Sequence, residues 1–144
     1  MSKQRKKGSA FEVLVMNHLR DHQPREVERV ALHGNRDEGD LLIRGTPKIC
    51  VECKNVAGYG PALLHSWQDQ TQVERGNSDA SIGLLVVHRE GCGPKSADHN
   101  DVWMTLADMV TLAQNVQDWD DIWVHVTLGD VEAMLSGETG KDQQ

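Results

Sequence analysis

Residues 39–54 have the sequence GDLLIRGTPKICVECK, in which two apolar segments flank a Gly-Thr-Pro turn. Strand-forming residues around a tight reversal predict a β-hairpin with strands over residues 40–44 and 49–55. Asp40, Glu52 and Lys54 are charged, yet they lie within or beside these apolar segments. A charge removed from water without a partner costs several kcal/mol. These side chains therefore either pair with one another or hold a metal ion.

The second strand of this hairpin has two different faces. Successive side chains of a strand point to opposite sides of the sheet, so Glu52 and Lys54 share one side with Cys50, while Val51 packs into the core on the other. Asp40 opens the adjacent strand of the hairpin. We therefore expect both carboxylates and the ammonium group to converge at one edge of the sheet.

The remaining pattern predicts an α/β protein with a sheet flanked by helices. The predicted elements, in chain order, are helix 9–22, strand 27–32, a polar turn at 34–39, the hairpin, helix 61–75, strand 82–87, loop 89–101, strand 102–104, helix 105–116, an exposed strand at 122–127 and helix 130–136. Strand 82–87 is continuously apolar, which is typical of a strand covered on both faces.

With 144 residues, the chain is expected to form one main domain. We predict a basic flexible arm at 1–8, the main domain at 9–128, and a short helix with a frayed tail at 129–144. No apolar run approaches the roughly 18 residues of a membrane span, and no signal peptide follows the basic start. We expect a soluble protein in the cytoplasm, without a membrane partner.

Charge is distributed unevenly along the sequence. Residues 1–54 contain 11 Lys and Arg against 8 Asp and Glu, whereas residues 55–144 contain 4 against 14. The basic start is able to engage a phosphate backbone while the acidic remainder keeps the protein in solution. A solubilising tail is an equally good interpretation of the composition alone.

Three cysteines indicate reduced thiols rather than a disulfide framework. Cys50 and Cys53 have CxxC spacing, but positions three apart on a strand point to opposite faces, so we do not expect zinc binding or redox chemistry. His88, Cys92 and His99 form only a weak metal-site candidate.

Two carboxylates suit Mg²⁺, which prefers oxygen ligands and keeps several bound waters. A neighbouring lysine is able to orient a metal-bound water or to stabilise charge developing on a phosphate. The alternative is a surface cluster of ion pairs, worth about 0–1 kcal/mol per pair. Residue chemistry alone leaves both interpretations open.

Asp40, eleven intervening residues and Glu52-Cys53-Lys54 resemble the signature of the PD-(D/E)XK nuclease superfamily. Gly39 replaces the proline of that signature. The segment 8–12, GSAFE, resembles the GxxFE opening of archaeal-type and phage Holliday junction resolvases. The likeness covers roughly residues 8–113 and implies a restriction-endonuclease-like mixed β-sheet flanked by helices.

The resemblance also implies roles for individual residues. Asp40, Glu52, the backbone carbonyl of Cys53 and Glu12 would bind Mg²⁺, with Mn²⁺ as a substitute, and Lys54 would act on the attacking water. Glu12 has a second explanation, because Ser9 and Glu12 have the spacing of a capping box.

Helix 61–75 corresponds to the helix that carries a functional Gln or Glu in these nucleases. Gln70 is the predicted site residue, Gln72 the alternative, and a solvated helix surface explains either one equally well.

The implied function is a homodimeric endonuclease that resolves Holliday junctions in DNA recombination and repair, in a phage or a cell. Branched DNA is the expected partner, and Trp103, Trp119 and Trp123 are candidates for apolar contact between protomers. Alternatives are another PD-(D/E)XK enzyme, such as a repair nickase or a restriction-type nuclease, or a non-catalytic DNA-binding protein of this fold. Phosphate contacts are expected from Lys3, Arg5, Lys6, Lys7, Arg36, Arg89 and Lys95.

Overall fold

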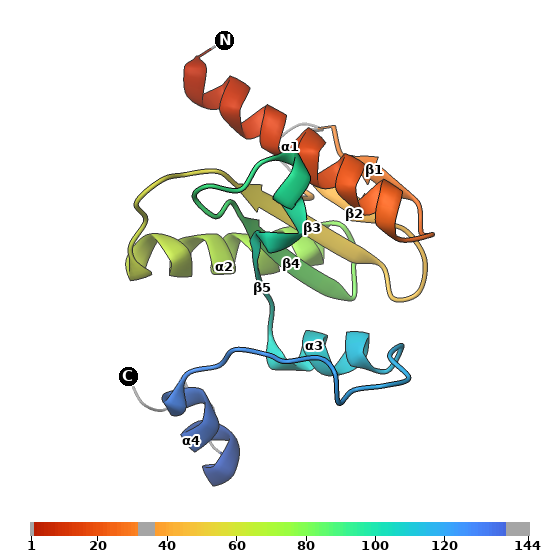
Figure 1. The fold of residues 1–144 in the computed structure, drawn as a ribbon, viewed down its shortest axis with the longest axis vertical. Coiled ribbons are helices and arrows are strands. Elements are labelled where there is room, and N and C mark those ends of the chain that lie inside the picture. Colours follow the sequence, from red (N-terminus) through yellow and green to blue (C-terminus); the bar gives the residue numbers. More distant parts are fainter. Residues whose placement is uncertain (1, 32–36, 138–144) are drawn as a thin grey trace. The chain divides into compact units, whose positions relative to one another are not determined.

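The structure, a computed structural model, describes residues 2–31 and 37–137 of the chain. The elements in chain order are α1 (Lys3–His22), β1 (Val27–Arg29), β2 (Leu41–Ile43), β3 (Ile49–Lys54), α2 (Pro61–Asn77), β4 (Ile82–Val87), the 3-10 helix η1 (Pro94–His99), β5 (Asp101–Trp103), α3 (Leu106–Ala113) and α4 (Leu128–Ser136) (Figure 1). The described residues include no helix that combines the length and apolar character needed to cross a bilayer.

Two compact units divide the chain, Met1–Thr111 and Leu112–Gln144. The end of the main domain was predicted after residue 128. The first unit contains the sheet and all predicted site residues that the structure describes.

The sheet of the first unit has five strands in the order β1-β2-β3-β4-β5. Strands β3 and β4 are parallel, and the other neighbouring pairs are antiparallel. Helix α2 forms the crossover that a parallel pair requires. The predicted hairpin is confirmed by the β2–β3 register, in which Leu41 pairs with Val51 and Ile43 with Ile49. The prediction of an α/β fold with a mixed sheet is also confirmed.

Different helices cover the two faces of the sheet (Figure 1). On one face, Trp67 of α2 packs in a cluster with Leu85 and Val87 of β4. On the other, Val15 of α1 lines a cavity together with Val51 of β3. Because side chains alternate along each strand, β3 and β4 are buried on both sides. The apolar sequence of β4 predicted this burial correctly.

Helix α1 begins at Lys3, well before the predicted start at Ser9, so the prediction of a flexible arm is wrong for the described residues of that segment. The Ser2 hydroxyl caps the helix by accepting a hydrogen bond of 3.3 Å from the Arg5 N–H. Lys, Gln and Arg have high helix propensity, which lets the basic segment extend the helix. The helix ends at His22, before Pro24, as predicted.

Several boundaries differ from the predictions by a few residues. Strand β1 ends at Arg29 rather than residue 32, which lies outside the described residues, and helix α3 ends at Ala113 rather than 116. The predicted cap of α3 is present, because the Thr105 hydroxyl accepts a hydrogen bond of 3.1 Å from the Asp108 N–H. The Asp108 carboxylate turns to the sheet and accepts from the Gly83 N–H at 3.2 Å.

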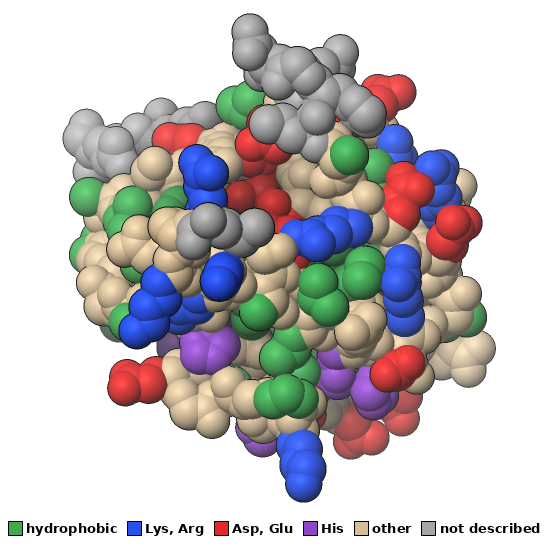
Figure 2. Space-filling model, turned by 90° about the horizontal axis from the view of Figure 1, so that it is seen from above, with side chains coloured by type: hydrophobic (Ala, Val, Ile, Leu, Met, Phe, Trp, Pro, Cys, Tyr) green, Lys and Arg blue, Asp and Glu red, His purple; other side chains and the backbone are tan. Residues whose placement is uncertain are grey.

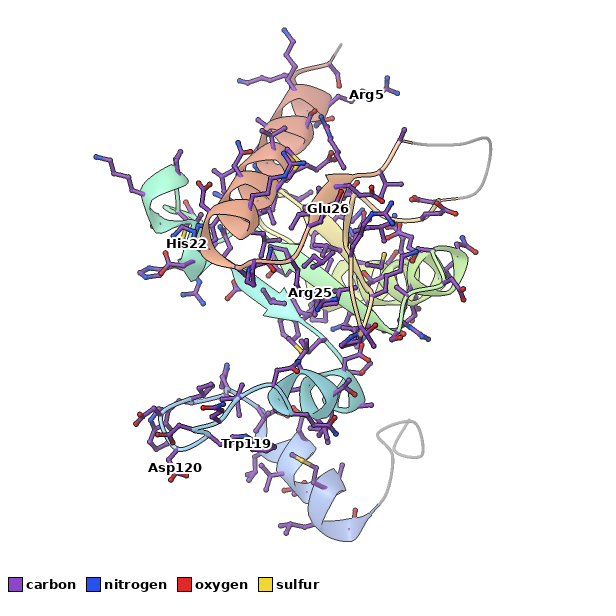
Figure 3. All side chains as sticks on the ribbon, turned by 90° about the vertical axis from the view of Figure 1, so that its right-hand side faces the viewer. Arg5, His22, Arg25, Glu26, Trp119 and Asp120 are labelled. Carbon is purple, nitrogen blue, oxygen red and sulfur yellow. The ribbon has the colours of Figure 1, made fainter. Side chains whose placement is uncertain are left out.

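The second unit contains helix α4, which Thr127 caps by accepting a hydrogen bond of 3.1 Å from the Asp130 N–H. The predicted strand at 122–127 is wrong, since this segment has no strand partner among the described residues. Its side chains are exposed, and Trp123 is 93% exposed. Figure 3 labels Trp119 and Asp120 of this unit, and Trp119 is also exposed. Alternating hydrophobicity indicates a strand only where a neighbouring strand completes the hydrogen bonds.

Candidate active site

Asp40 lies immediately before β2, one position beyond the Leu41–Val51 pair of the hairpin. Its backbone N–H donates to the Val51 carbonyl at 3.0 Å, and its Oδ2 accepts from the Cys53 N–H at 2.8 Å. Burial, followed by the negative charge of Glu52, raises the pKa of Asp40 to about 8. The main chain of the hairpin thus holds the Asp40 carboxyl group at a position where its charged form is disfavoured.

Gly39 sets the direction from which the chain enters this site. Its φ is +91°, a conformation that side chains rarely adopt. A Cβ atom at this position would lie 2.6 Å from the Cys50 sulfur and 3.3 Å from the Val51 carbonyl oxygen. Proline, which fixes φ near −65°, does not fit this backbone. The departure from the nuclease signature therefore has a local structural reason.

Glu52 and Lys54 lie on the same side of β3, as the alternation predicted. Lys54 Nζ is 3.0 Å from Glu52 Oε1, and the Glu52 side chain is only 5% exposed. Both residues pair with β4 on one side, while the β2 ladder ends at Val51 on the other. Because β2 ends there, Glu52 and Lys54 have a neighbouring strand only on the β4 side. Their other side faces Asp40.

Gln70 and Glu74, one turn apart on α2, reach the same group of side chains. The Gln70 side-chain oxygen accepts from Lys54 Nζ at 3.1 Å, and its Nε2 donates to Glu74 Oε1 at 2.7 Å and to Glu52 Oε1 at 3.4 Å. Gln72 instead accepts from Arg75 Nε at 3.0 Å. Of the two candidate glutamines, Gln70 is the one that contacts the site.

Glu74 is almost fully buried, with a relative exposure of 1%. Burial and the adjacent Glu52 carboxyl raise the pKa of Glu74 to about 10, with a smaller contribution from Asp37. Glu74 was not among the site residues predicted from the sequence. Its spacing of four from Gln70 on a helix was the signal that pointed to it.

Glu12 lies in the middle of α1, so the capping-box explanation for Ser9 and Glu12 is wrong: Ser2 caps this helix. Glu12 raises the pKa of Asp40 and therefore lies within electrostatic range of the site. Its Oε2 is bonded to Arg29 of β1, at 2.8 Å from one guanidinium nitrogen and 3.1 Å from another. Arg29 also donates to the Ser9 hydroxyl at 2.6 Å. Sequence reasoning did not identify Arg29.

The basic candidates lie in different surroundings. Lys3, Arg5, Lys6 and Lys7 are exposed in the first turns of α1, and Figure 3 shows Arg5 pointing away from the helix. Lys95 is exposed in η1, whereas Arg89 is ion-paired with Asp101, and Arg36 lies outside the described residues. In the view of Figure 2, acidic side chains gather in one hollow of the surface, and Lys and Arg side chains lie on either side of it.

The cysteines are free thiols, and Cys50 and Cys53 are both buried. The Cys50 thiol donates to the Glu38 carbonyl at 3.3 Å, and burial raises its pKa to about 12. Burial also raises the pKa of Cys53. His88 makes a contact of 2.9 Å with the Cys92 carbonyl, so its ring nitrogen faces the backbone rather than the thiol.

Across residues 2–31 and 37–137, no group of three or more His, Cys, Asp or Glu side chains gathers in a way that could hold a metal ion. The predicted ligand set contains three carboxylates, those of Asp40, Glu52 and Glu12, with the carbonyl of Cys53. These three carboxylates are not gathered into such a group among the described residues, and Glu12 is bonded to Arg29 instead. Mg²⁺ is commonly bound by one or two carboxylates with several retained waters. The buried Glu52 and the partly buried Asp40 supply oxygen donors that suit such a cation. The pKa of Asp40 is raised first by desolvation and then by Glu52, so a bound cation would favour its charged form.

No protein-family model, curated protein or solved structure matches this chain. The interpretation of the site therefore rests on its own geometry and on the motif resemblance.

Proposed function

We propose that this chain is a metal-dependent, structure-selective DNA endonuclease with a restriction-endonuclease-like fold, and that it resolves Holliday junctions. The observation that carries the proposal is the grouping of Asp40, Glu52 and Lys54 at the open end of the β2–β3 hairpin. Asp40 is held by the Cys53 N–H at 2.8 Å, and Glu52 lies 3.0 Å from Lys54. Ion pairing alone does not account for Asp40, whose pKa is raised rather than lowered.

In this proposal Asp40, Glu52 and the carbonyl oxygen of Cys53 hold Mg²⁺, and Mn²⁺ serves as a substitute. When bound, the cation supplies a nucleophilic water and stabilises charge on the phosphodiester. Lys54 orients the attacking water or balances the negative charge that grows on the phosphate. Gln70 holds Lys54 Nζ in place through its side-chain oxygen. Glu12 is the remaining proposed ligand, and it has to exchange its bond to Arg29 for the metal.

The proposed substrate is branched DNA, bound through its phosphates. Lys3, Arg5, Lys6 and Lys7 form an exposed basic surface on the first turns of α1, and Lys95 adds an exposed charge on η1. Such contacts position a backbone without identifying bases, which favours selection by DNA structure. Resolution of a four-way junction requires two symmetric cuts, so we propose a twofold homodimer with one site in each protomer.

A cleavage assay on synthetic DNA tests this proposal. A four-way junction, a flap, a linear duplex and a single strand are each incubated with the protein in Mg²⁺, in Mn²⁺ and in a chelator. We expect paired nicks near the centre of the junction that require the metal. Equal cutting of the linear duplex favours the restriction-type alternative, and a single nick favours the repair alternative. Binding of the junction without any cutting favours the non-catalytic alternative.

Glu52→Gln and Glu28→Gln make a matched pair for the same assay. Glu28 of β1 belongs to a partly exposed ion pair with Arg44, the residue that follows β2, and it pairs across the sheet with Leu42. We expect Glu52→Gln to lose cleavage by a factor of at least about 100 while it still binds the junction, because a metal ligand is lost. Glu28→Gln should cut like the wild type. Unchanged cutting by purified Glu52→Gln contradicts the assignment of the metal site.

A further inference from the structure

The side chain of Glu74 is a carboxyl group in a buried environment, which disfavours a polar group. It lies on α2 with a relative exposure of 1%. No N–H or O–H donor among the described residues reaches its buried Oε2 atom, and its carboxyl group lies against the carboxyl group of Glu52. The other oxygen of Glu74, Oε1, accepts from Gln70 Nε2 at 2.7 Å. Burial of one carboxyl group beside another costs stability, so an apolar residue of similar size would serve packing better. The presence of a carboxyl group therefore requires another explanation.

The hydrogen bond to Gln70 leads from Glu74 to the proposed catalytic lysine. The oxygen of the Gln70 amide accepts from Lys54 Nζ at 3.1 Å, and Lys54 Nζ lies 3.0 Å from Glu52 Oε1. The amide nitrogen of Gln70 donates to Glu74 and, at 3.4 Å, to Glu52. We call this hydrogen-bonded set of four side chains the α2 relay, although it transfers no proton. It consists of Glu52 and Lys54 of β3 and Gln70 and Glu74 of α2.

The orientation of the Gln70 amide decides whether the relay holds Lys54. An amide has an oxygen that only accepts and an NH₂ group that only donates, and the two ends are similar in shape. Rotation by half a turn would present the NH₂ group to the Lys54 ammonium, and two donors repel each other. Glu74 accepts from the NH₂ group at the far end and thereby keeps the oxygen directed at Lys54.

We infer that Glu74 is a positioning residue of the active site, which fixes the Gln70 amide so that its oxygen holds Lys54 Nζ beside Glu52. This inference rests on the proposed nuclease function and adds a residue that the motif resemblance did not select. Glu74 acts through Gln70 and touches no reacting atom. Its loss should therefore reduce the rate of the chemical step and leave DNA binding unchanged.

Two substitutions separate a positioning role from a packing role. Glu74→Met keeps the size of the side chain and removes both oxygens. Glu74→Gln keeps an oxygen that accepts from Gln70. Gln72→Met is the control on the same helix, because Gln72 bonds to Arg75 and is not part of the α2 relay. Single-turnover cleavage, junction affinity and the thermal midpoint are measured for each variant.

We expect Glu74→Met to lower the single-turnover rate about tenfold or more with unchanged affinity, since misplaced catalytic groups carry costs of this order. Its thermal midpoint should equal or exceed that of the wild type, because a buried carboxyl group beside Glu52 is replaced by an apolar side chain. Glu74→Gln should recover the rate to within about threefold of the wild type. A lower midpoint for Glu74→Met, without rescue by Glu74→Gln, indicates a packing role and overturns the inference.

A second readout does not depend on activity. The Lys54 ammonium, held by Glu52 and Gln70, should exchange its protons with water slowly enough to give a ¹⁵N–¹H signal, assigned with Lys54→Arg. Glu74→Met should accelerate this exchange, and Gln72→Met should not. If the wild type cuts no DNA but Lys54 exchange depends on Glu74, the proposed function fails and the relay stands. If the wild type cuts DNA and Glu74→Met leaves both rate and exchange unchanged, or if no protected Lys54 signal exists, the relay is overturned.

Discussion

Oδ2 of Asp40 accepts a hydrogen bond of 2.8 Å from the backbone N–H of Cys53. The antiparallel pairing of β2 with β3 brings these two residues together. The bond directs one carboxylate oxygen at the main chain of β3, next to Glu52. It lowers the pKa of Asp40, but burial and Glu52 outweigh it. The site therefore stores electrostatic repulsion between two carboxylates, which either a proton or a cation relieves.

Asp40→Asn should leave the fold intact and abolish the response to metal. The asparagine oxygen still accepts from Cys53, while the repulsion with Glu52 disappears, so the metal-free thermal midpoint at pH 8 should equal or exceed that of the wild type. The rise in midpoint that Mg²⁺ gives the wild type by binding the native state should be absent in the variant. Scanning calorimetry with and without Mg²⁺ measures both effects, and Asp21→Asn, at an exposed position near the end of α1, is the control.

Gly39→Ala should destabilise the hairpin by about 1–3 kcal/mol, because the new methyl group meets strain at a positive φ and a close contact. That contact is the Cys50 sulfur at 2.6 Å. Gly58→Ala is the matched control, with φ +67° but no atom within 4 Å of the added Cβ. Urea denaturation of both variants separates contact from strain. Equal losses would mean that the Cys50 sulfur moves aside at no cost.

Stability of the metal-free protein should fall as pH rises from about 5 to about 9. The pKa of Asp40 is raised from 3.8 to about 8 and that of Glu74 from 4.5 to about 10. The folded state therefore binds more protons than the unfolded state across this window, and each group's contribution is lost as pH rises through its folded pKa. Thermal midpoints in chelator at several pH values measure the slope. Glu74→Gln should flatten it, and a midpoint that rises with pH contradicts the assignment.

The hairpin was predictable because its signals are local. The Gly-Thr-Pro turn and the flanking apolar residues determine the β2–β3 register, and the alternation within β3 then places Glu52 and Lys54 on one side. The continuous apolar run of β4 predicted a strand covered on both faces in the same way. These features depend on residues close together in the sequence.

The contacts that complete the site were not predictable from local pattern. Arg29 reaches Glu12 because α1 packs against β1, and Glu74 reaches the site because α2 packs on the face of β3 that carries Glu52. Both contacts depend on how a helix packs against a strand, which the local sequence pattern does not specify. The strand predicted at 122–127 failed for the complementary reason, since its alternation has no partner strand among the described residues.

The basic turns of α1 should control DNA affinity rather than the chemical step. Replacement of Lys3, Arg5, Lys6 and Lys7 by glutamine should weaken junction binding, because each residue that contacts a phosphate releases a counterion. The slope of log affinity against log salt should fall by about 0.9 for each duplex phosphate contact that is lost. Gel-shift titrations at several salt concentrations measure the slope, and single-turnover rates at saturating protein should stay within about twofold of the wild type.

Arg89→Gln provides the comparison for this set. Arg89 is exposed but ion-paired with Asp101, so it has to break that pair before it contacts a phosphate, and its removal should change the salt slope less than removal of one α1 lysine that contacts DNA. Helix propensity is similar for Lys, Arg and Gln, so the fourfold variant should keep helix α1 and a circular dichroism spectrum like that of the wild type. If the fourfold variant binds the junction with unchanged affinity and slope, phosphate binding lies elsewhere on the molecule, and α1 has no part in it.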